Sequence, residues 1–175
     1  MTGLYINNDP LSVRIRVADI IEGTSVDGPG LRTTIYMAGC AHHCPGCHNP
    51  STWDPAGGRE ISVGELAGII EEAAFPLTLS GGDPLMQPEA TEALLREIRT
   101  RMSSDIWLYT GYTFEEILAS RKFSALLPWL DVIVDGPFIE SLKDSSLLFR
   151  GSANQRLIDV RESLSRHTVV EYNIL

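Results

Sequence analysis

The chain has 175 residues, and its 14 lysines and arginines against 23 aspartates and glutamates give a formal net charge of −9. A composition of 43% hydrophobic and 21% charged residues is typical of one globular domain, which we expect to span residues 1–175. A closed eight-fold β/α barrel usually takes about 250 residues and rarely fewer than about 200, so a full barrel is excluded and a partial one is not. An acidic surface repels phosphate backbones and anionic lipids, so we expect a protein or small-molecule partner, with no nucleic acid and no membrane.

The sequence carries no pattern that predicts export or membrane insertion. Its first ten residues lack the basic and apolar regions of a signal peptide. The most apolar stretch, 123–139, is interrupted by serine, proline and two aspartates, and is therefore too polar to span a bilayer. We expect a cytoplasmic protein.

Short apolar runs bounded by glycine, proline or aspartate predict strands along the chain. They are expected at residues 13–21, 31–37, 76–80, 106–110, 131–135, 157–160 and 169–172. Turn-forming residues predict a loop at 22–30, and a polar stretch rich in glycine and proline occupies 49–60.

Helices are expected between several of these strands. Ser62 with Glu65 three residues later predicts a capping box, and apolar residues at helical spacing follow it. Pro88 suits the first turn of a second helix, whose apolar residues recur every four positions. Thr113 with Glu116 predicts another capping box. Strands and helices that alternate in this way predict β/α units around a mainly parallel sheet.

All three cysteines of the chain lie within residues 40–47. An odd number so close together is poor evidence for disulfides and better evidence for a metal or cluster site. Three residues separate Cys40 from Cys44, two separate Cys44 from Cys47, and a Pro-Gly bend between the last two lets the thiolates face one point. A cubane cluster has four irons, so three cysteines leave one iron open to a substrate or cofactor.

A structural zinc site is the alternative interpretation of the same loop, with one of His42, His43 or His48 as the fourth ligand. Zinc fingers usually join two ligand pairs from separated segments, and no second pair follows in this sequence. The spacing therefore favours a cluster, and a zinc-binding interaction module without catalytic activity is the non-enzyme alternative. We expect His42 and His43 to be solvated loop residues.

The cysteine loop resembles that of the radical S-adenosylmethionine (SAM) superfamily, whose open cluster iron binds the amino and carboxylate groups of SAM. Segments around this loop resemble the activating enzymes of glycyl-radical enzymes, namely 27–32, 48–49 and 52–53. Others resemble the activating proteins of anaerobic ribonucleoside-triphosphate reductases, namely 80–85, 109–112, 131–138, 149–152 and 154–155. Together they cover most of the chain between residues 13 and 160.

The resemblance implies a single-domain α/β fold, a partial (open) β/α barrel with a mainly parallel sheet. It implies that Cys40, Cys44 and Cys47 hold a [4Fe-4S] cluster and that SAM binds at the open iron. Reductive cleavage of SAM would then give a 5′-deoxyadenosyl radical, which takes a hydrogen atom from a glycine of the partner enzyme. The implied partners are the catalytic subunit of the anaerobic ribonucleoside-triphosphate reductase and a low-potential electron donor such as flavodoxin; a homodimer is left open.

The resemblance also implies a set of cofactor contacts. Backbone groups just before and after the third cysteine would lie beside SAM, and the Gly-Gly-Asp segment would bind its methionine amino group, with the aspartate as an optional charge partner. The residues concerned are Gly46, Cys47, His48, Gly81, Gly82 and Asp83. From the residues alone, 81–83 is equally consistent with an ordinary strand-to-helix turn. The same two alternatives, a contact with the ribose or adenine of SAM and an ordinary turn, hold for 109–112.

Other features leave alternatives open. Many superfamily members have an aromatic residue where this chain has Gly46, and His48 with 52–54 is closer to pyruvate formate-lyase activating enzymes. An activating enzyme of that type, or another small radical SAM enzyme, is therefore the enzymatic alternative. Residues 27–30 precede their strand, so we expect a structural turn on the face opposite to the site, with a contact to the partner enzyme as the alternative. Residues 150–155 either form a docking edge for the partner or hydrogen-bond within a loop.

Overall fold

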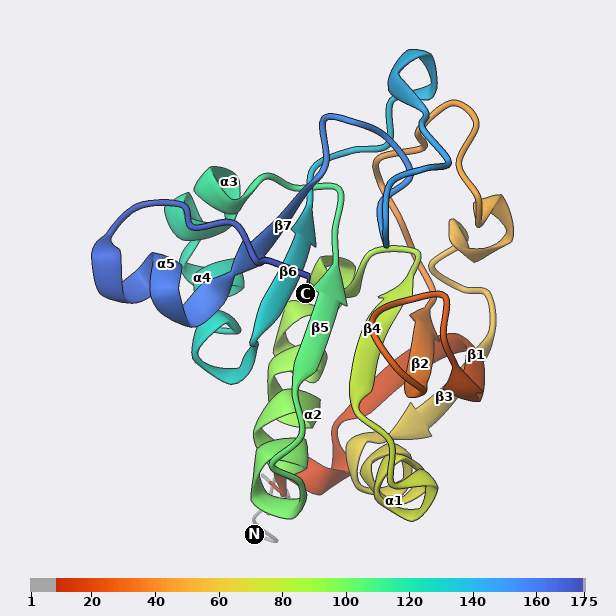
Figure 1. The fold of residues 1–175 in the computed structure, drawn as a ribbon. Coiled ribbons are helices and arrows are strands. Elements are labelled where there is room, and N and C mark those ends of the chain that lie inside the picture. Colours follow the sequence, from red (N-terminus) through yellow and green to blue (C-terminus); the bar gives the residue numbers. More distant parts are fainter. Residues whose placement is uncertain (1–8, 175) are drawn as a thin grey trace, which may run out of the picture.

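The computed structural model describes residues 9–174. Residues 1–8 and 175, which include both ends of the predicted domain and most of the segment considered for export, lie outside the described part. Within that part, seven strands form one sheet in the order β3-β1-β2-β4-β5-β6-β7, and five α-helices accompany it (Figure 1). No helix within residues 9–174 is long and apolar enough to cross a membrane.

The strands are β1 (Arg14–Thr24), β2 (Arg32–Met37), β3 (Arg59–Ser62), β4 (Leu77–Gly81), β5 (Ile106–Tyr109), β6 (Val132–Asp135) and β7 (Arg156–Asp159). The α-helices are α1 (Val63–Ala73), α2 (Pro88–Arg101), α3 (Phe114–Ala119), α4 (Arg121–Ser124) and α5 (Val160–Arg166). Short 3-10 helices lie at Pro10–Ser12, Pro50–Thr52, Pro84–Met86, Leu127–Trp129 and Glu140–Leu142.

The four middle strands β2, β4, β5 and β6 are parallel, whereas β3 and β1 on one side and β7 on the other pair antiparallel. The sheet is therefore mixed, and the expectation of a mainly parallel sheet needs this correction. Parallel pairing needs a long crossover, usually a helix, that returns the chain to the same end of the sheet. Residues 25–31 between β1 and β2, and 136–155 between β6 and β7, contain no α-helix, so the chain returns antiparallel.

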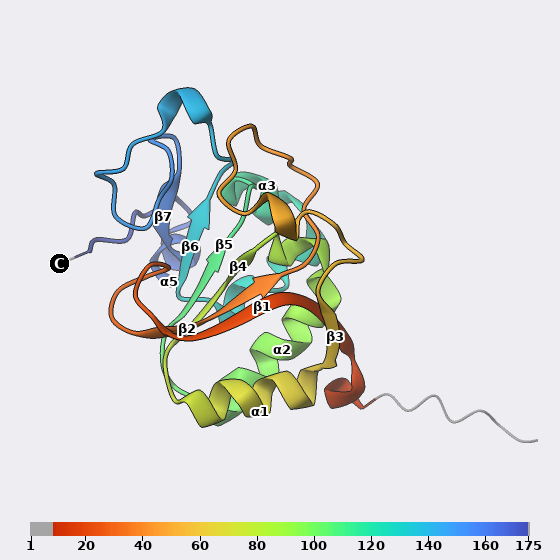
Figure 2. The same cartoon turned by 90° about the vertical axis from the view of Figure 1, so that its right-hand side faces the viewer.

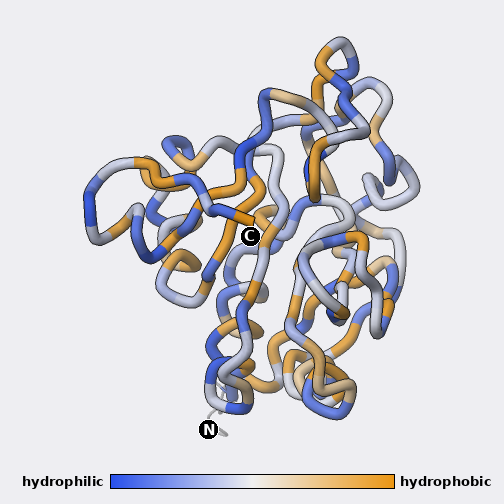
Figure 3. Tube along the Cα trace, in the orientation of Figure 1, coloured by the Kyte–Doolittle hydropathy of each residue, from blue (hydrophilic) through white to orange (hydrophobic). Residues whose placement is uncertain are grey.

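Helices α1 and α2 cover one face of the sheet (Figures 1 and 2). Ile35, Leu79 and Leu108 are register neighbours on β2, β4 and β5, and all three are fully buried in one cluster with Leu66 of α1 and Leu94 of α2. Figure 3 shows the apolar residues concentrated on the strands and the polar ones on the loops. Each such aliphatic side chain stabilises the fold by about 1.5–3 kcal/mol when buried, so this face holds the main core.

The opposite face of the sheet, here called the inner face, is more polar. Thr34, Thr78 and Trp107 are register neighbours on it, and all are buried. The loop 25–31 lies over this face (Figure 1). It is held there by Asp27, whose carbonyl accepts a hydrogen bond from Thr78 Oγ1 at 2.9 Å and whose carboxylate accepts one from the Tyr36 hydroxyl at 2.6 Å.

The helices begin where the sequence predicts. Thr113 and Glu116 form the predicted capping box at α3 with both of its hydrogen bonds. At α1 the Ser62 side chain accepts a hydrogen bond from the Glu65 N–H at 3.1 Å, which is one half of the predicted box. Pro88 occupies the first position of α2, as predicted.

Three elements differ from the sequence prediction. β3 begins inside the polar stretch 49–60, where no strand is expected. It is an edge strand that pairs with β1 alone. No helix is expected after the strand at 157–160, but α5 follows β7 directly and is capped by the side chain of Asp159. The strand expected at 169–172 is reduced to one isolated bridge between Ile158 and Glu171.

The charged side chain of Arg32, at the start of β2, is only 1% exposed. Its guanidinium donates hydrogen bonds to Thr78 Oγ1 at 2.7 Å and to the Leu77 carbonyl at 2.8 Å, and it forms an ion pair with Asp105 at 2.9 Å. It also lies over the Trp107 ring, 5.3 Å from the ring centroid. Arg32 therefore joins three neighbouring strands at the end of the sheet where β2 begins.

We predict that Arg32→Ala lowers the free energy of unfolding by about 2–3 kcal/mol, because it leaves buried acceptors without a charged donor. Arg14 provides the control, since its ion pair with Glu60 joins two side chains that are 51% and 48% exposed. Arg14→Ala should cost less than about 1 kcal/mol. Urea unfolding followed by circular dichroism measures both, and equal losses in the two variants would contradict the role given to Arg32.

Candidate functional site

A cavity lies where β4, β5 and β6 end and the cysteine loop 40–47 begins. Ligands usually bind at this carboxyl edge of parallel strands in α/β folds. The predicted site residues on its wall are Cys40, Cys44, Cys47, His48, Gly81 and Gly82. Wall residues that the sequence did not assign to the site include Asp27, Gly136, Phe138, Gly151 and Gln155. Gly46 and Asp83, which the sequence did assign to it, are not part of the wall.

The three cysteines are free thiols, each partly exposed. The backbone fixes the loop at both ends: the Cys40 N–H donates to the Trp53 carbonyl, and the Cys47 N–H donates to the Cys44 carbonyl, each at 3.1 Å. Burial raises the pKa of the Cys40 thiol above its usual range. Because cysteine binds metals as the thiolate, metal binding at Cys40 must release this proton.

The three thiols match the ligand set of an iron–sulfur cluster. All three cysteines reach one cavity. A cubane cluster takes each thiolate on a separate iron, so three cysteines hold three of its four irons.

Gly81 and Gly82 end β4 and pack on the chain's own backbone. Gly81 has a φ of +96°, and a Cβ there would lie 2.5 Å from the Met37 nitrogen. At Gly82 a Cβ would lie 2.3 Å from the Gly39 carbonyl oxygen. The Gly82 and Asp83 N–H groups donate to the Met37 and Gly39 carbonyls, both at 2.8 Å. These glycines therefore let β4 support the backbone just before Cys40, and they still line the cavity.

The Asp83 carboxylate is 1% exposed and accepts four hydrogen bonds. One of them joins it to His42 Nε2 of the cysteine loop at 2.9 Å. This bond raises the pKa of His42. The expectation of a solvated His42 is therefore wrong, because the ring is held between the loop and the sheet. His43 is exposed, as expected, and packs edge-on against Trp53.

The turn 27–30 was expected on the face opposite to the site, and this is wrong for Asp27, which lines the cavity. The reason is that the loop folds back over the inner face, where Tyr36 holds the Asp27 carboxylate. Burial and the neighbouring Asp27 raise the pKa of Tyr36. Gly28 permits the fold, since a Cβ there would lie 2.7 Å from Arg32 Cδ.

Residues 150–155 hydrogen-bond within the chain, which is one of the two alternatives open from the sequence. Gln155 Oε1 accepts from the Gly151 N–H at 2.8 Å, and its Nε2 donates to the Gly136 carbonyl at 3.1 Å. Asn154 Nδ2 donates to the Pro137 carbonyl at 2.8 Å. These amides hold the segment after β6 against the segment before β7, and both segments line the cavity opposite the cysteines.

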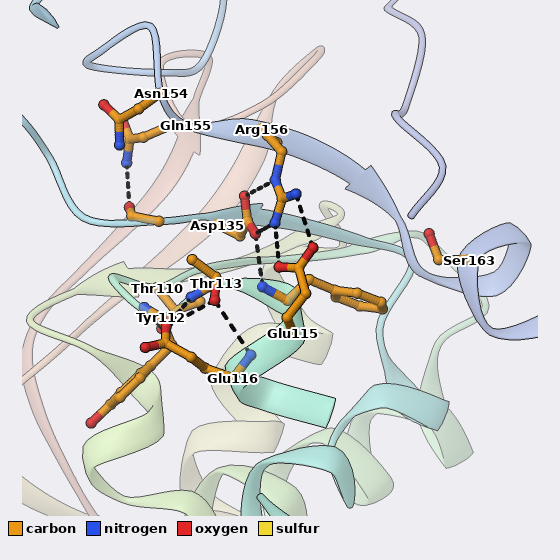
Figure 4. A network of polar contacts seen from close by, with 12 residues as sticks. Thr110, Tyr112, Thr113, Glu115, Glu116, Asp135, Asn154, Gln155, Arg156 and Ser163 are labelled. Carbon is orange, nitrogen blue, oxygen red and sulfur yellow. Dashed lines mark hydrogen bonds and ion pairs between the residues drawn. The ribbon is translucent and has the colours of Figure 1, made fainter. Parts of the chain in front are cut away.

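An ion-pair network supports the same wall (Figure 4). Arg156 of β7 pairs with the buried Asp135 of β6 and with Glu115 of α3. Asp135 also accepts a hydrogen bond from the Phe114 N–H at 2.8 Å. The network thus joins β6, β7 and the start of α3 directly behind the wall residue Gly136. The sequence signal was an aspartate at the end of a buried strand, but its partners are distant in the chain.

We predict that Glu115→Gln lowers stability at pH 7 by less than about 1 kcal/mol, because Glu115 is 58% exposed. Arg156 lowers the pKa of Glu115 from its ordinary value of 4.5. A carboxylate with a lowered folded pKa stabilises the protein above its unfolded pKa and loses this effect as the pH falls through the folded value. The difference between wild type and variant should therefore shrink below a pH of 4.5.

Urea unfolding across this pH range measures the effect. Glu72→Gln, on the exposed side of α1, is the control and should show no such change. A Glu115→Gln difference that is the same at neutral and acid pH would contradict the assignment.

Comparison with known proteins adds to this geometry. The model of the 4Fe-4S single cluster domain family matches residues 26–158. The anaerobic ribonucleoside-triphosphate reductase-activating protein of Vibrio cholerae is 43% identical over 140 residues, which cover 74% of this chain and 88% of that protein. The chain belongs to this family. The activating protein of Escherichia coli K12 is 38% identical over 74% of this chain and 89% of its own length. That of enterobacteria phage T4 is 39% identical over 81% of this chain and 92% of its own length.

The activating-protein family predicted from the motifs is thereby confirmed. The family match includes the cysteine loop, the glycines that end β4 and the amides of 154–155, so it contains both walls of the cavity. The family model describes a 4Fe-4S cluster, which supports the cluster interpretation of the three cysteines over a zinc-binding module.

Proposed function

We propose that the chain activates an anaerobic ribonucleoside-triphosphate reductase by forming a glycyl radical on its catalytic subunit. The observation that carries the proposal is the position of three free cysteines on one cavity at the carboxyl edge of the parallel strands, in a chain whose relatives are activating proteins of this reductase. When bound, a [4Fe-4S] cluster and SAM supply the one-electron cleavage that yields a 5′-deoxyadenosyl radical able to take hydrogen from a glycine.

The protein's own residues would bind and enclose these groups. Cys40, Cys44 and Cys47 would hold the cluster. Backbone groups of Gly46 to His48, and of Gly81 and Gly82, would contact SAM. The ring centroid of Phe138, in the segment after β6, lies 5.3 Å from that of His48, so the two sides of the cavity meet at these side chains.

The architecture suits a protein substrate. We propose a single domain over residues 1–175 and a partial barrel that stays open, because the four parallel strands are flanked by antiparallel ones. A second hollow on the inner face shares Asp27, His48, Tyr109 and Gly151 with the cavity. It offers a peptide segment of the reductase a path to the site. A low-potential donor such as flavodoxin would supply the electron in the cytoplasm, and a homodimer remains compatible with this scheme.

We predict a glycyl radical on the reductase when the reduced, iron-loaded protein is incubated with SAM and the catalytic subunit. Electron paramagnetic resonance detects the radical, and chromatography detects 5′-deoxyadenosine. A mixture without SAM is the control. Formation of 5′-deoxyadenosine with a radical on pyruvate formate-lyase, and none on the reductase, would favour that enzyme's type of activator. A colourless protein that contains zinc without iron would refute the enzymatic proposal.

We also predict that Cys40→Ala, Cys44→Ala and Cys47→Ala each abolish SAM cleavage and lower the iron content after anaerobic reconstitution, because each removes one cluster ligand. His43→Ala is the matched control from the same loop, since its exposed ring contacts Trp53 and not the cavity wall. Iron, sulfide and 5′-deoxyadenosine are measured for each protein. Any cysteine variant that cleaves SAM at the wild-type rate would overturn the ligand assignment.

A further inference from the structure

The Asp83 carboxylate has all of its partners within the chain. Its Oδ2 accepts from the Thr110 hydroxyl at 2.9 Å, the Gly111 N–H at 3.0 Å and His42 Nε2 at 2.9 Å. Its Oδ1 accepts from the Leu85 N–H at 2.9 Å. Oδ2, with three donors, has no lone pair left to accept a further bond, whereas Oδ1 has one donor and keeps a lone pair. Asp83 is also buried to 1% exposure and is absent from the cavity wall that Gly81 and Gly82 line.

His42 reaches Asp83 from the middle of the cysteine loop. Its ring fits a space that the sheet leaves for it: a Cβ on Gly111 would lie 2.4 Å from His42 Cδ2. On its other side the ring meets Tyr112 edge-on, with the centroids 4.6 Å apart. Gly111 and Tyr112 follow β5, and Asp83 follows β4, so His42 joins the loop to the ends of two parallel strands.

We propose that Asp83 is a positioning residue that acts through His42: the pair holds the cysteine loop against the ends of β4 and β5. Asp83 does not contact the amino group of SAM in this arrangement, because its carboxylate is 1% exposed and absent from the cavity wall, and its Oδ2 is occupied by His42, Thr110 and Gly111. The inference rests on the proposed function where it concerns cluster and SAM, and it replaces the charge-partner role that the sequence suggested for Asp83.

The first test uses the metal-free protein, so it does not depend on the cluster. Amide hydrogen exchange is compared for wild type, His42→Ala, Asp83→Ala and the double variant, with His43→Ala as the control from the same loop. We expect exchange of the two hydrogen-bonded amides of the loop, those of Cys40 and Cys47, to become about tenfold faster in both single variants, the factor of losing one hydrogen bond to a charged group. The double variant should be no faster than the single ones, because both remove the same link.

His42→Gln is the rescue variant, since its amide can donate to Asp83 from a similar reach. It should restore slow exchange in the loop, and His43→Ala should leave exchange unchanged. If Asp83→Ala does not fold, the comparison of His42→Ala with His42→Gln still decides whether the hydrogen bond to Asp83 slows exchange in the loop. Unchanged exchange in His42→Ala would overturn the proposal.

The second test uses iron-loaded protein. Transfer of iron to a chelator should be about tenfold faster for His42→Ala and for Asp83→Ala, in keeping with the loosened loop. SAM affinity, measured by equilibrium dialysis at equal iron content, should fall equally in the two variants. Weaker SAM binding in Asp83→Ala alone, with iron transfer unchanged, would show that Asp83 contacts the cofactor. It would refute the positioning role proposed for Asp83 and His42.

The two proposals fail in distinguishable ways. A wild-type protein that binds no iron would refute the proposed function, and the exchange measurement would still decide the role of His42. If the protein activates the reductase but neither His42→Ala nor Asp83→Ala changes amide hydrogen exchange in the cysteine loop, only this inference is refuted.

Discussion

The close contact between Gly82 and Gly39 is the constraint on which the site depends. A side chain at Gly82 would collide with the Gly39 carbonyl, so this contact exists only between bare backbones. It fixes the point at which the chain leaves β2 for the cysteines, and it places the next residue, Asp83, beneath the loop. Glycine on β4 therefore shapes a cofactor site through the backbone of another segment.

The two faces of the sheet differ in composition and packing. The helix-covered face is a conventional apolar core, whereas the inner face carries Thr34, Trp107 and Tyr109, whose buried polar atoms have no hydrogen-bond partner within residues 9–174. The two walls of the cavity are likewise held in place by different kinds of contact. Backbone packing at Gly81 and Gly82 supports the cysteine side, and side-chain amides and ion pairs support the side after β6.

Local patterns in the sequence predicted the local features of the structure. Helix starts such as Thr113 with Glu116, and the middle strands, depend on neighbouring residues and were predicted correctly. The spacing of the cysteines predicted a cluster, and the 4Fe-4S family match supports it. The errors concern long-range contacts. The fold-back of Asp27 onto Thr78, the capture of His42 by Asp83 and the pairing of β3 with β1 depend on residues distant in the chain, for which periodicity and spacing hold no signal. β3 was missed because Ile61 is the only apolar residue among its four, which is too few to show an alternating pattern.

The antiparallel flanks also determine how the sheet ends. Each edge strand, β3 and β7, is four residues long. The free side of β7 is already covered, because backbone groups at 170 and 172 hydrogen-bond to residues 159 and 157. β3 begins with the exposed charges of Arg59 and Glu60. Long, flat, uncharged edges recruit strands from other chains, so the short, covered or charged edges of this sheet disfavour edge-to-edge aggregation.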